Sequence, residues 1–117
     1  MSRQLASYAY CGKEAYLTQP YSNAVEGFVA TKVIENLLFD VQGYVGYLPS
    51  DQSIFVVFKG TQSSKEWAMD LDTTQNSYDT WPECNCKVHA GFNRAVNLVW
   101  ESVLGEVSRL QALNPTY

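Results

Sequence analysis

The pattern of apolar and polar positions divides the chain into a helical start, three strands and one long helix. Residues 28–35, 41–48 and 53–59 are rich in β-branched and aromatic side chains, which favour strands. The turn sequence PSDQ at 49–52 separates the last two strands, so we expect them to form an antiparallel hairpin. Residues 54–58 are apolar without interruption, as expected of a strand buried on both faces.

Helical spacing of apolar residues marks the two ends of the chain. Residues 2–17 predict a short amphipathic helix. Residues 73–87 are polar and rich in turn formers, so they predict a long surface connection. After them a long helix is expected, ended by Asn114 and Pro115, with one apolar stripe formed by Phe92, Val96, Val99, Val103, Val107 and Leu110.

A doubly buried strand followed by a long striped helix is half of a β-α-β unit. Its other half would be a second parallel strand reached by a right-handed crossover. Because the sequence stops at Tyr117, the pattern predicts one domain over residues 1–117 that is the front portion of a larger α/β domain. The alternative is a complete α+β fold in which the helix covers one face of a three-stranded meander, and the pattern alone favours neither.

Composition narrows the class of protein. With 46% hydrophobic and 17% charged residues among 117, the chain has the make-up of a single soluble globular domain. Its net charge of -4 and its lack of basic clusters disfavour nucleic acid as a partner. The apolar runs are far shorter than the ~20 residues that span a bilayer. Residues 2–16 do not resemble a secretory signal, so an exported protein would have this as its mature sequence.

The three cysteines leave two interpretations open. Zinc is disfavoured, because a structural site needs four ligands and His89 is the only other candidate beside the cysteines. No metal and no cofactor are therefore expected. A disulfide between Cys84 and Cys86 requires a tight turn, which would leave Cys11 without a partner in an oxidising compartment. The alternative is three reduced thiols in a cytosolic protein.

An ordered set of motifs resembles the fungal-type class 3 lipase family, which includes feruloyl esterases. The set comprises ASYAYC at 6–11, VVFKGT at 56–61, WAMDL at 67–71, KVHAGF at 87–92, and NPTY after the long helix. The resemblance implies an α/β class, specifically a partial α/β-hydrolase that ends before the nucleophile elbow. Its expected elements are an N-terminal helix, a three-stranded antiparallel meander, a short lid helix and a long crossover helix, with the second half of the sheet absent.

The resemblance implies an oxyanion hole where the third strand ends. Gly60 would permit a backbone conformation closed to other residues. The backbone N–H of Thr61 would then point at the developing alkoxide, a contact typically worth about 2.7 to 4 kcal/mol of barrier. Lys59 replaces the arginine usual in the family, and it lacks the planar fork that would anchor the turn.

The segment after this turn is implied to be a lid. Ser63 and Glu66 form a capping box that begins a short helix. A bulky indole suits a lid that closes over an apolar cleft and opens at a lipid–water interface, although Trp67 could equally be a core residue. The residues assigned to the lid and to substrate contact are Ser64, Trp67, Met69 and Leu71, and Asp70 is assigned to the lid hinge.

The catalytic triad is missing from these 117 residues. The sequence contains no G-x-S-x-G, so the serine, acid and histidine of the family are expected beyond Tyr117 or not at all, and the chain by itself is expected to be inactive. His89 is interpreted as a structural residue near the helix start, because the catalytic base of α/β-hydrolases follows the nucleophile in the chain.

Two functions remain as hypotheses. The first is a secreted or lumenal carboxylic ester hydrolase, triacylglycerol lipase-like, which acts on lipid or other ester substrates through an acyl-enzyme when the protein is complete. The second is a non-catalytic, lipase-derived subunit or binding module. Its sheet would be completed along the edge of strand 53–59 by the missing C-terminal half or by another chain.

Overall fold

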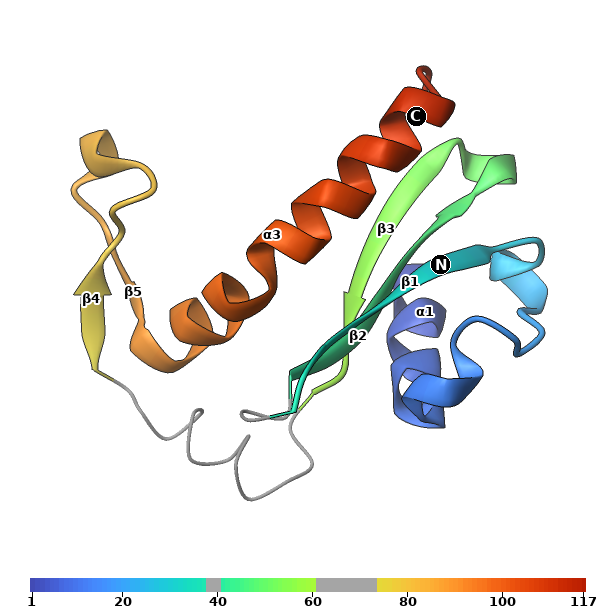
Figure 1. Cartoon of the computed structure of the whole chain (residues 1–117), viewed down its shortest axis with the longest axis horizontal. Coiled ribbons are helices and arrows are strands. Elements are labelled where there is room, and N and C mark those ends of the chain that lie inside the picture. Colours follow the sequence, from blue (N-terminus) through green and yellow to red (C-terminus); the bar gives the residue numbers. More distant parts are fainter. Residues whose placement is uncertain (38–40, 61–73) are drawn as a thin grey trace.

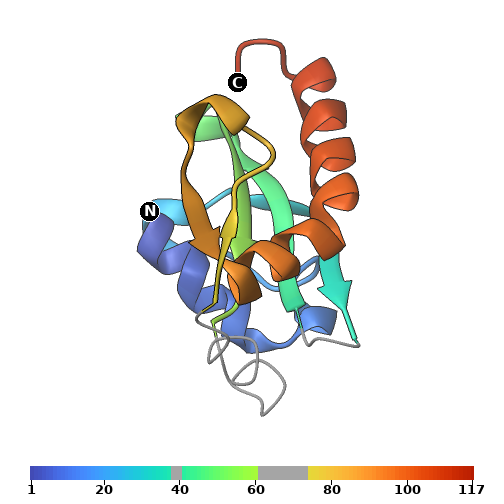
Figure 2. The same ribbon diagram turned by 90° about the vertical axis from the view of Figure 1, so that its left-hand side faces the viewer.

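A three-stranded antiparallel sheet forms the middle layer of the molecule, with α1 on one face and α3 on the other (Figures 1 and 2). The structure is a computed structural model that describes residues 1–37, 41–60 and 74–117. The predicted meander is confirmed, because the strand order is β1-β2-β3 with antiparallel pairing throughout. These elements are α1 (Ser2–Tyr8), β1 (Val29–Asn36), β2 (Val41–Leu48), β3 (Ser53–Phe58) and α3 (Ala90–Leu113).

β2 is the central strand, and two glycines let its neighbours approach closely. A Cβ built at Gly43 would collide with the carbonyl oxygen of Val57, and one built at Gly46 would collide with that of Val29. Next to Gly46, the pairing of β1 and β2 shifts register between Ala30 and Lys32. Both glycines of β2 therefore serve the packing of backbone against backbone.

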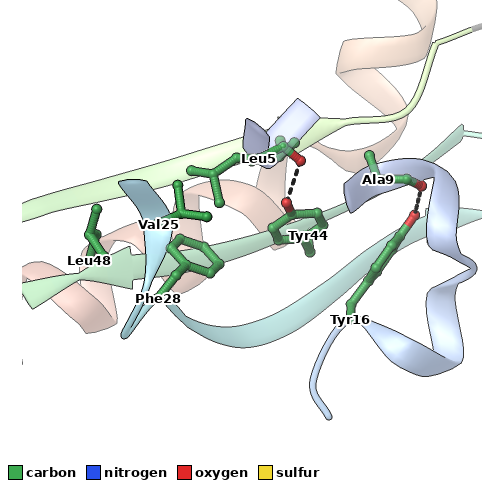
Figure 3. Close-up of a cluster of buried hydrophobic side chains, with 8 residues drawn as sticks. Leu5, Ala9, Tyr16, Val25, Phe28, Tyr44 and Leu48 are labelled. Atoms are coloured by element: carbon green, nitrogen blue, oxygen red, sulfur yellow. Dashed lines mark hydrogen bonds between the residues drawn. The ribbon is translucent and has the colours of Figure 1, made fainter. Parts of the chain in front are cut away.

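The core on the α1 side of the sheet is rich in aromatic rings whose hydroxyls are all used (Figure 3). Tyr44 is fully buried and donates to the Leu5 carbonyl of α1 at 2.5 Å. Tyr16 is equally buried and donates to the Ala9 carbonyl at 2.5 Å. Buried hydroxyls that are satisfied in this way fix the N-terminal segment against the sheet in one position.

The core on the other face joins the sheet to α3 from Val99 onward. Val99, Val103 and Leu110 of the helix pack against Ile34 and Val45 of the sheet. The predicted apolar stripe continues towards the N-terminus of α3, but there it is not buried.

Phe92 is 56% exposed and Val96 is 45% exposed, so the first two residues of the apolar stripe are not covered. The physical reason is visible in Figure 1, where the first turns of α3 run beyond the edge of the three-stranded sheet. Periodicity places residues on one helix face, but it does not say how far the sheet beneath extends.

Two other expected boundaries differ from the structure. The N-terminal helix ends at Tyr8 instead of residue 17, because two 3₁₀ turns follow it, separated by Gly12 with φ of 93°. The expected surface connection contains a small antiparallel hairpin of β4 (Gln75–Ser77) and β5 (Lys87–His89). This hairpin lies beside the N-terminal end of α3, away from the main sheet (Figure 1). Within the three described ranges, no helix combines the length and apolar character needed to cross a membrane.

Candidate functional site

The end of β3 is the described part of the expected oxyanion turn. The Lys59 amide donates to the Gln42 carbonyl at 2.8 Å, which continues the β2–β3 pairing by one bond beyond Phe58. The next amide, that of Gly60, points away from β2, as every second amide of an antiparallel strand does, and donates to the hydroxyl oxygen of Tyr10 with an N···O distance of 3.1 Å. β3 ends at Phe58, and beyond it Lys59 bonds to β2 while Gly60 bonds to the N-terminal segment.

A neighbouring side chain approaches Gly60 closely. A Cβ built there would collide with the Tyr10 hydroxyl oxygen. The expected reason, a backbone conformation closed to other residues, is wrong, because Gly12 and Gly27 are the described glycines with positive φ and Gly60 is not among them. A larger residue at position 60 would displace Tyr10 or the end of the strand.

The assigned donor and lid residues fall between residues 61 and 73, outside the described ranges. The oxyanion role of Thr61, the lid roles and the hinge role therefore stay predictions. The residues concerned are Thr61, Ser64, Trp67, Met69, Asp70 and Leu71.

His89 lies where β5 passes into α3. Its Nδ1 accepts a hydrogen bond from the Phe92 amide at 3.2 Å, which satisfies one of the free N–H groups of the first helical turn. Its ring also stacks on Phe92, with 4.3 Å between the ring centroids. These contacts give the histidine a place at the helix start, as the structural interpretation expects, and its role stays a prediction.

The cysteine pair forms a disulfide, which is one of the two interpretations that the sequence left open. Cys84 and Cys86 are bonded through their sulfurs, with their Cα atoms 5.1 Å apart. Asn85 between them has φ of 48°, which is the tight turn that the bridge requires. Cys11 is exposed and free. The described residues contain no group of three His, Cys, Asp or Glu side chains that could hold a metal ion.

Tyr10 is the residue near this turn that sequence reasoning did not single out. It lies within ASYAYC, a motif of the resemblance to which no role was assigned. Its contact with Gly60 joins residues 50 positions apart, so no local pattern indicates it.

The family model for class 3 lipases matches residues 55–117, which is the stretch from the middle of β3 to Tyr117, four residues beyond the long helix. The chain belongs to the class 3 lipase family.

Relatives within the class 3 lipases are fungal. The chain is 31% identical to a secreted alkaline triacylglycerol lipase of Penicillium cyclopium, over 74% of this chain and 32% of that protein. It is 30% identical to a lipase of Rhizopus oryzae, over 97% of this chain and 29% of that protein. The matched region thus spans about a third of the length of these curated relatives.

Solved lipase structures superpose on nearly all residues of this class 3 lipase chain. A fungal lipase–inhibitor complex superposes with a TM-score of 0.86 at 26% identity, over 99% of this chain and 44% of that one. A triacylglycerol lipase from Penicillium expansum gives a TM-score of 0.78 at 25% identity, over 99% of this chain and 43% of that one. These neighbours confirm the predicted partial α/β-hydrolase fold, with its N-terminal helix, three-stranded sheet and long helix.

Proposed function

We propose that the protein is a carboxylic ester hydrolase of lipid esters and that this region supplies its oxyanion turn and its lid. The observation that carries the proposal is the match of residues 55–117 to the class 3 lipases, since it runs from β3 across Gly60 to the long helix. The bond between the Gly60 amide and Tyr10 supports it, because it holds the backbone at the end of β3 against the N-terminal segment, next to the proposed donor.

In the proposed reaction, a serine outside these 117 residues attacks the ester carbonyl, and the tetrahedral intermediate carries negative charge on its oxygen. The amide N–H of Thr61 donates to that oxygen together with the amide that follows the serine. A preorganised donor of this kind contributes about 2.7 to 4 kcal/mol to lowering the barrier. Collapse of the intermediate expels the alcohol and leaves an acyl-enzyme, which water then hydrolyses.

The proposed substrates are triacylglycerols or related lipid esters at a lipid–water interface. The relative from Penicillium cyclopium is a secreted triacylglycerol lipase, which supports both this substrate class and secretion of the present protein. The lid helix would use Trp67, Met69 and Leu71 to cover an apolar cleft in water and to contact lipid when open.

The test uses the product of the complete reading frame that encodes these residues. It should hydrolyse emulsified tributyrin and p-nitrophenyl butyrate, and a serine-directed phosphonate should abolish both activities. The 117-residue chain is the matched control and should show no turnover, because it contains no G-x-S-x-G. Absence of ester hydrolysis in the complete product, or hydrolysis by the 117-residue chain, would contradict the proposal.

A second function, that of a non-catalytic binding module, is favoured by the exposed apolar residues on α3. Phe92, Val96 and Trp100 are 56%, 45% and 50% exposed, and β3 pairs only with β2 among the described strands. A binding module whose sheet is completed by another chain would cover these surfaces. Analytical ultracentrifugation of the complete product separates the two: a stable hetero-complex without hydrolysis supports the module, and an active monomer contradicts it.

A further inference from the structure

The turn that carries Tyr10 is rigidly held by the core on the α1 side of the sheet. Tyr10 lies in the 3₁₀ turn Ala9–Cys11, and Ala9 beside it is completely buried. The Ala9 carbonyl accepts from the buried Tyr16 hydroxyl at 2.5 Å. The Tyr10 side chain itself is 49% exposed, so it projects from an anchored backbone to the surface where β3 ends.

The core on the α1 side of the sheet also holds the end of β3 through Gln42 of β2. The Gln42 side chain donates from Nε2 to the Tyr16 hydroxyl oxygen at 2.7 Å. The backbone carbonyl of Gln42 accepts from the Lys59 amide at 2.8 Å. Two successive amides at the end of β3, those of Lys59 and Gly60, are therefore tied to one connected group of buried and half-buried side chains.

These contacts close a ring of hydrogen bonds around the end of the strand. The ring runs from Gly60 to Tyr10, through the adjoining Ala9 carbonyl to Tyr16, on to Gln42, and back to the strand at Lys59. Its only contact with the Gly60 amide is the Tyr10 hydroxyl. Because peptide units are planar, fixing the Gly60 nitrogen leaves only the φ and ψ of Gly60 to set the direction of the next unit.

We propose that Tyr10 is a positioning residue, which fixes the path by which the backbone leaves β3 at Gly60 and thereby aims the oxyanion donor. This inference rests on the proposed ester hydrolysis. A donor stabilises the transition state only while it is held in place before the charge develops, so loss of its support lowers kcat. Tyr10 touches neither the substrate nor the reacting atoms in this role.

The first experiment measures the hydrogen bond between the Gly60 amide and the Tyr10 hydroxyl. In the product of the complete reading frame labelled with ¹⁵N-glycine, Tyr10→Phe should shift the Gly60 amide proton upfield and speed its hydrogen exchange about 5-fold. Tyr8→Phe is the matched control, because it also removes one hydroxyl hydrogen bond, to Ser22 Oγ at 3.2 Å, from the same segment. It should leave the Gly60 resonance and its exchange rate unchanged. An unchanged Gly60 amide in Tyr10→Phe would overturn the inference.

The second experiment separates positioning from general stability. Tyr10→Phe should lower kcat for p-nitrophenyl butyrate roughly 10-fold and leave KM within about twofold, because the lost support matters only in the transition state. Tyr8→Phe should keep both parameters. Absence of hydrolysis in the wild-type product contradicts the proposed function. Hydrolysis with kcat unchanged in Tyr10→Phe contradicts the role of Tyr10 alone.

Discussion

Glu106 of α3 accepts a hydrogen bond from the hydroxyl of Thr31 at 2.6 Å. This bond ties the long helix to β1, an edge strand of the three-stranded sheet. Arg109, one turn along the helix, donates to the same carboxylate from two nitrogens at 3.0 and 2.6 Å. The Glu106 side chain is only 8% exposed. The Arg109 hydrogen bonds hold the pKa of Glu106 down to about 2, with help from Thr31 and against the effect of burial.

The first prediction is a pH-dependent loss of stability through Glu106. The pKa of Glu106 falls from its ordinary value of 4.5 to about 2 in the folded protein. The stabilisation of the fold by the charged carboxylate is therefore complete above pH 4.5 and is lost as the pH falls towards 2. Glu106→Gln should lower the free energy of unfolding at pH 7 by on the order of 3 kcal/mol. By pH 3 the gap to wild type should shrink by more than half. Urea unfolding at both pH values measures it.

Glu101→Gln provides the control for this experiment, because Glu101 is exposed on the same helix. It should change the free energy of unfolding little at either pH. A gap between wild type and Glu106→Gln that is the same at pH 7 and pH 3 would refute the role assigned to the charged carboxylate.

The second prediction compares a glycine that has no room for a side chain with one that has open space around it. Gly46→Ala should destabilise the fold severely, because the new methyl group would meet the Val29 carbonyl oxygen of the neighbouring strand. Gly105 of α3 has open space around it, so Gly105→Ala should stabilise the protein by about 0.5 to 1 kcal/mol through helix propensity. Thermal unfolding followed by circular dichroism should show shifts of opposite sign, and shifts of the same sign would contradict the packing described for β2.

The third prediction compares two valines of the predicted stripe. Val99 is 4% exposed in the core under α3, whereas Val96 is 45% exposed one turn earlier. Val99→Ala should lower the free energy of unfolding by about 2 kcal/mol through lost burial and a residual cavity. Val96→Ala should lower it by less than about 0.5 kcal/mol. Equal losses in urea unfolding would mean that the first turns of α3 are covered as well.

The fourth prediction concerns the buried hydroxyl of Tyr44. Tyr44→Phe removes the bond to the Leu5 carbonyl and should lower the free energy of unfolding by about 1 to 2 kcal/mol at pH 8. Burial raises the pKa of Tyr44 above its ordinary 10.0, so its neutral form stabilises the fold below pH 10 and this stabilisation is lost as pH rises further. Wild type should therefore lose more stability between pH 8 and pH 10.5 than Tyr44→Phe. Tyr78→Phe, in the β4–β5 region, should lose as much as wild type.

The sheet could be predicted from sequence because its signal is local. The apolar run from Ile54 to Phe58 and the turn before it set the β2–β3 hairpin at the expected residues. The expected burial of this strand on both faces is wrong for the described residues, because Val56 and Phe58 are 39% and 40% exposed. The long helix likewise begins and ends within two residues of expectation, at Ala90 and Leu113. In each case the residues that decide the structure lie within a few positions of one another.

Features that depend on distant neighbours escaped prediction. Helical spacing continues past Tyr8 because 3₁₀ and α-helical periods are similar, and only the backbone at Gly12 reveals the break. β4 and β5 are short and polar strands that pair only with each other, so they carry no apolar alternation. The Tyr10 contact joins positions 50 apart and has no sequence pattern at all.

The central claim is that the backbone leaving β3 presents an amide to a developing oxyanion. The most direct measurement is a crystal structure of the complete reading-frame product inhibited by a serine-directed phosphonate. The account predicts the phosphonyl oxygen at about 2.7 to 3.1 Å from the Thr61 amide nitrogen, with Gly60 still bonded to Tyr10. A Thr61 amide paired within the β2–β3 ladder, with the phosphonyl oxygen held by other donors, would contradict it.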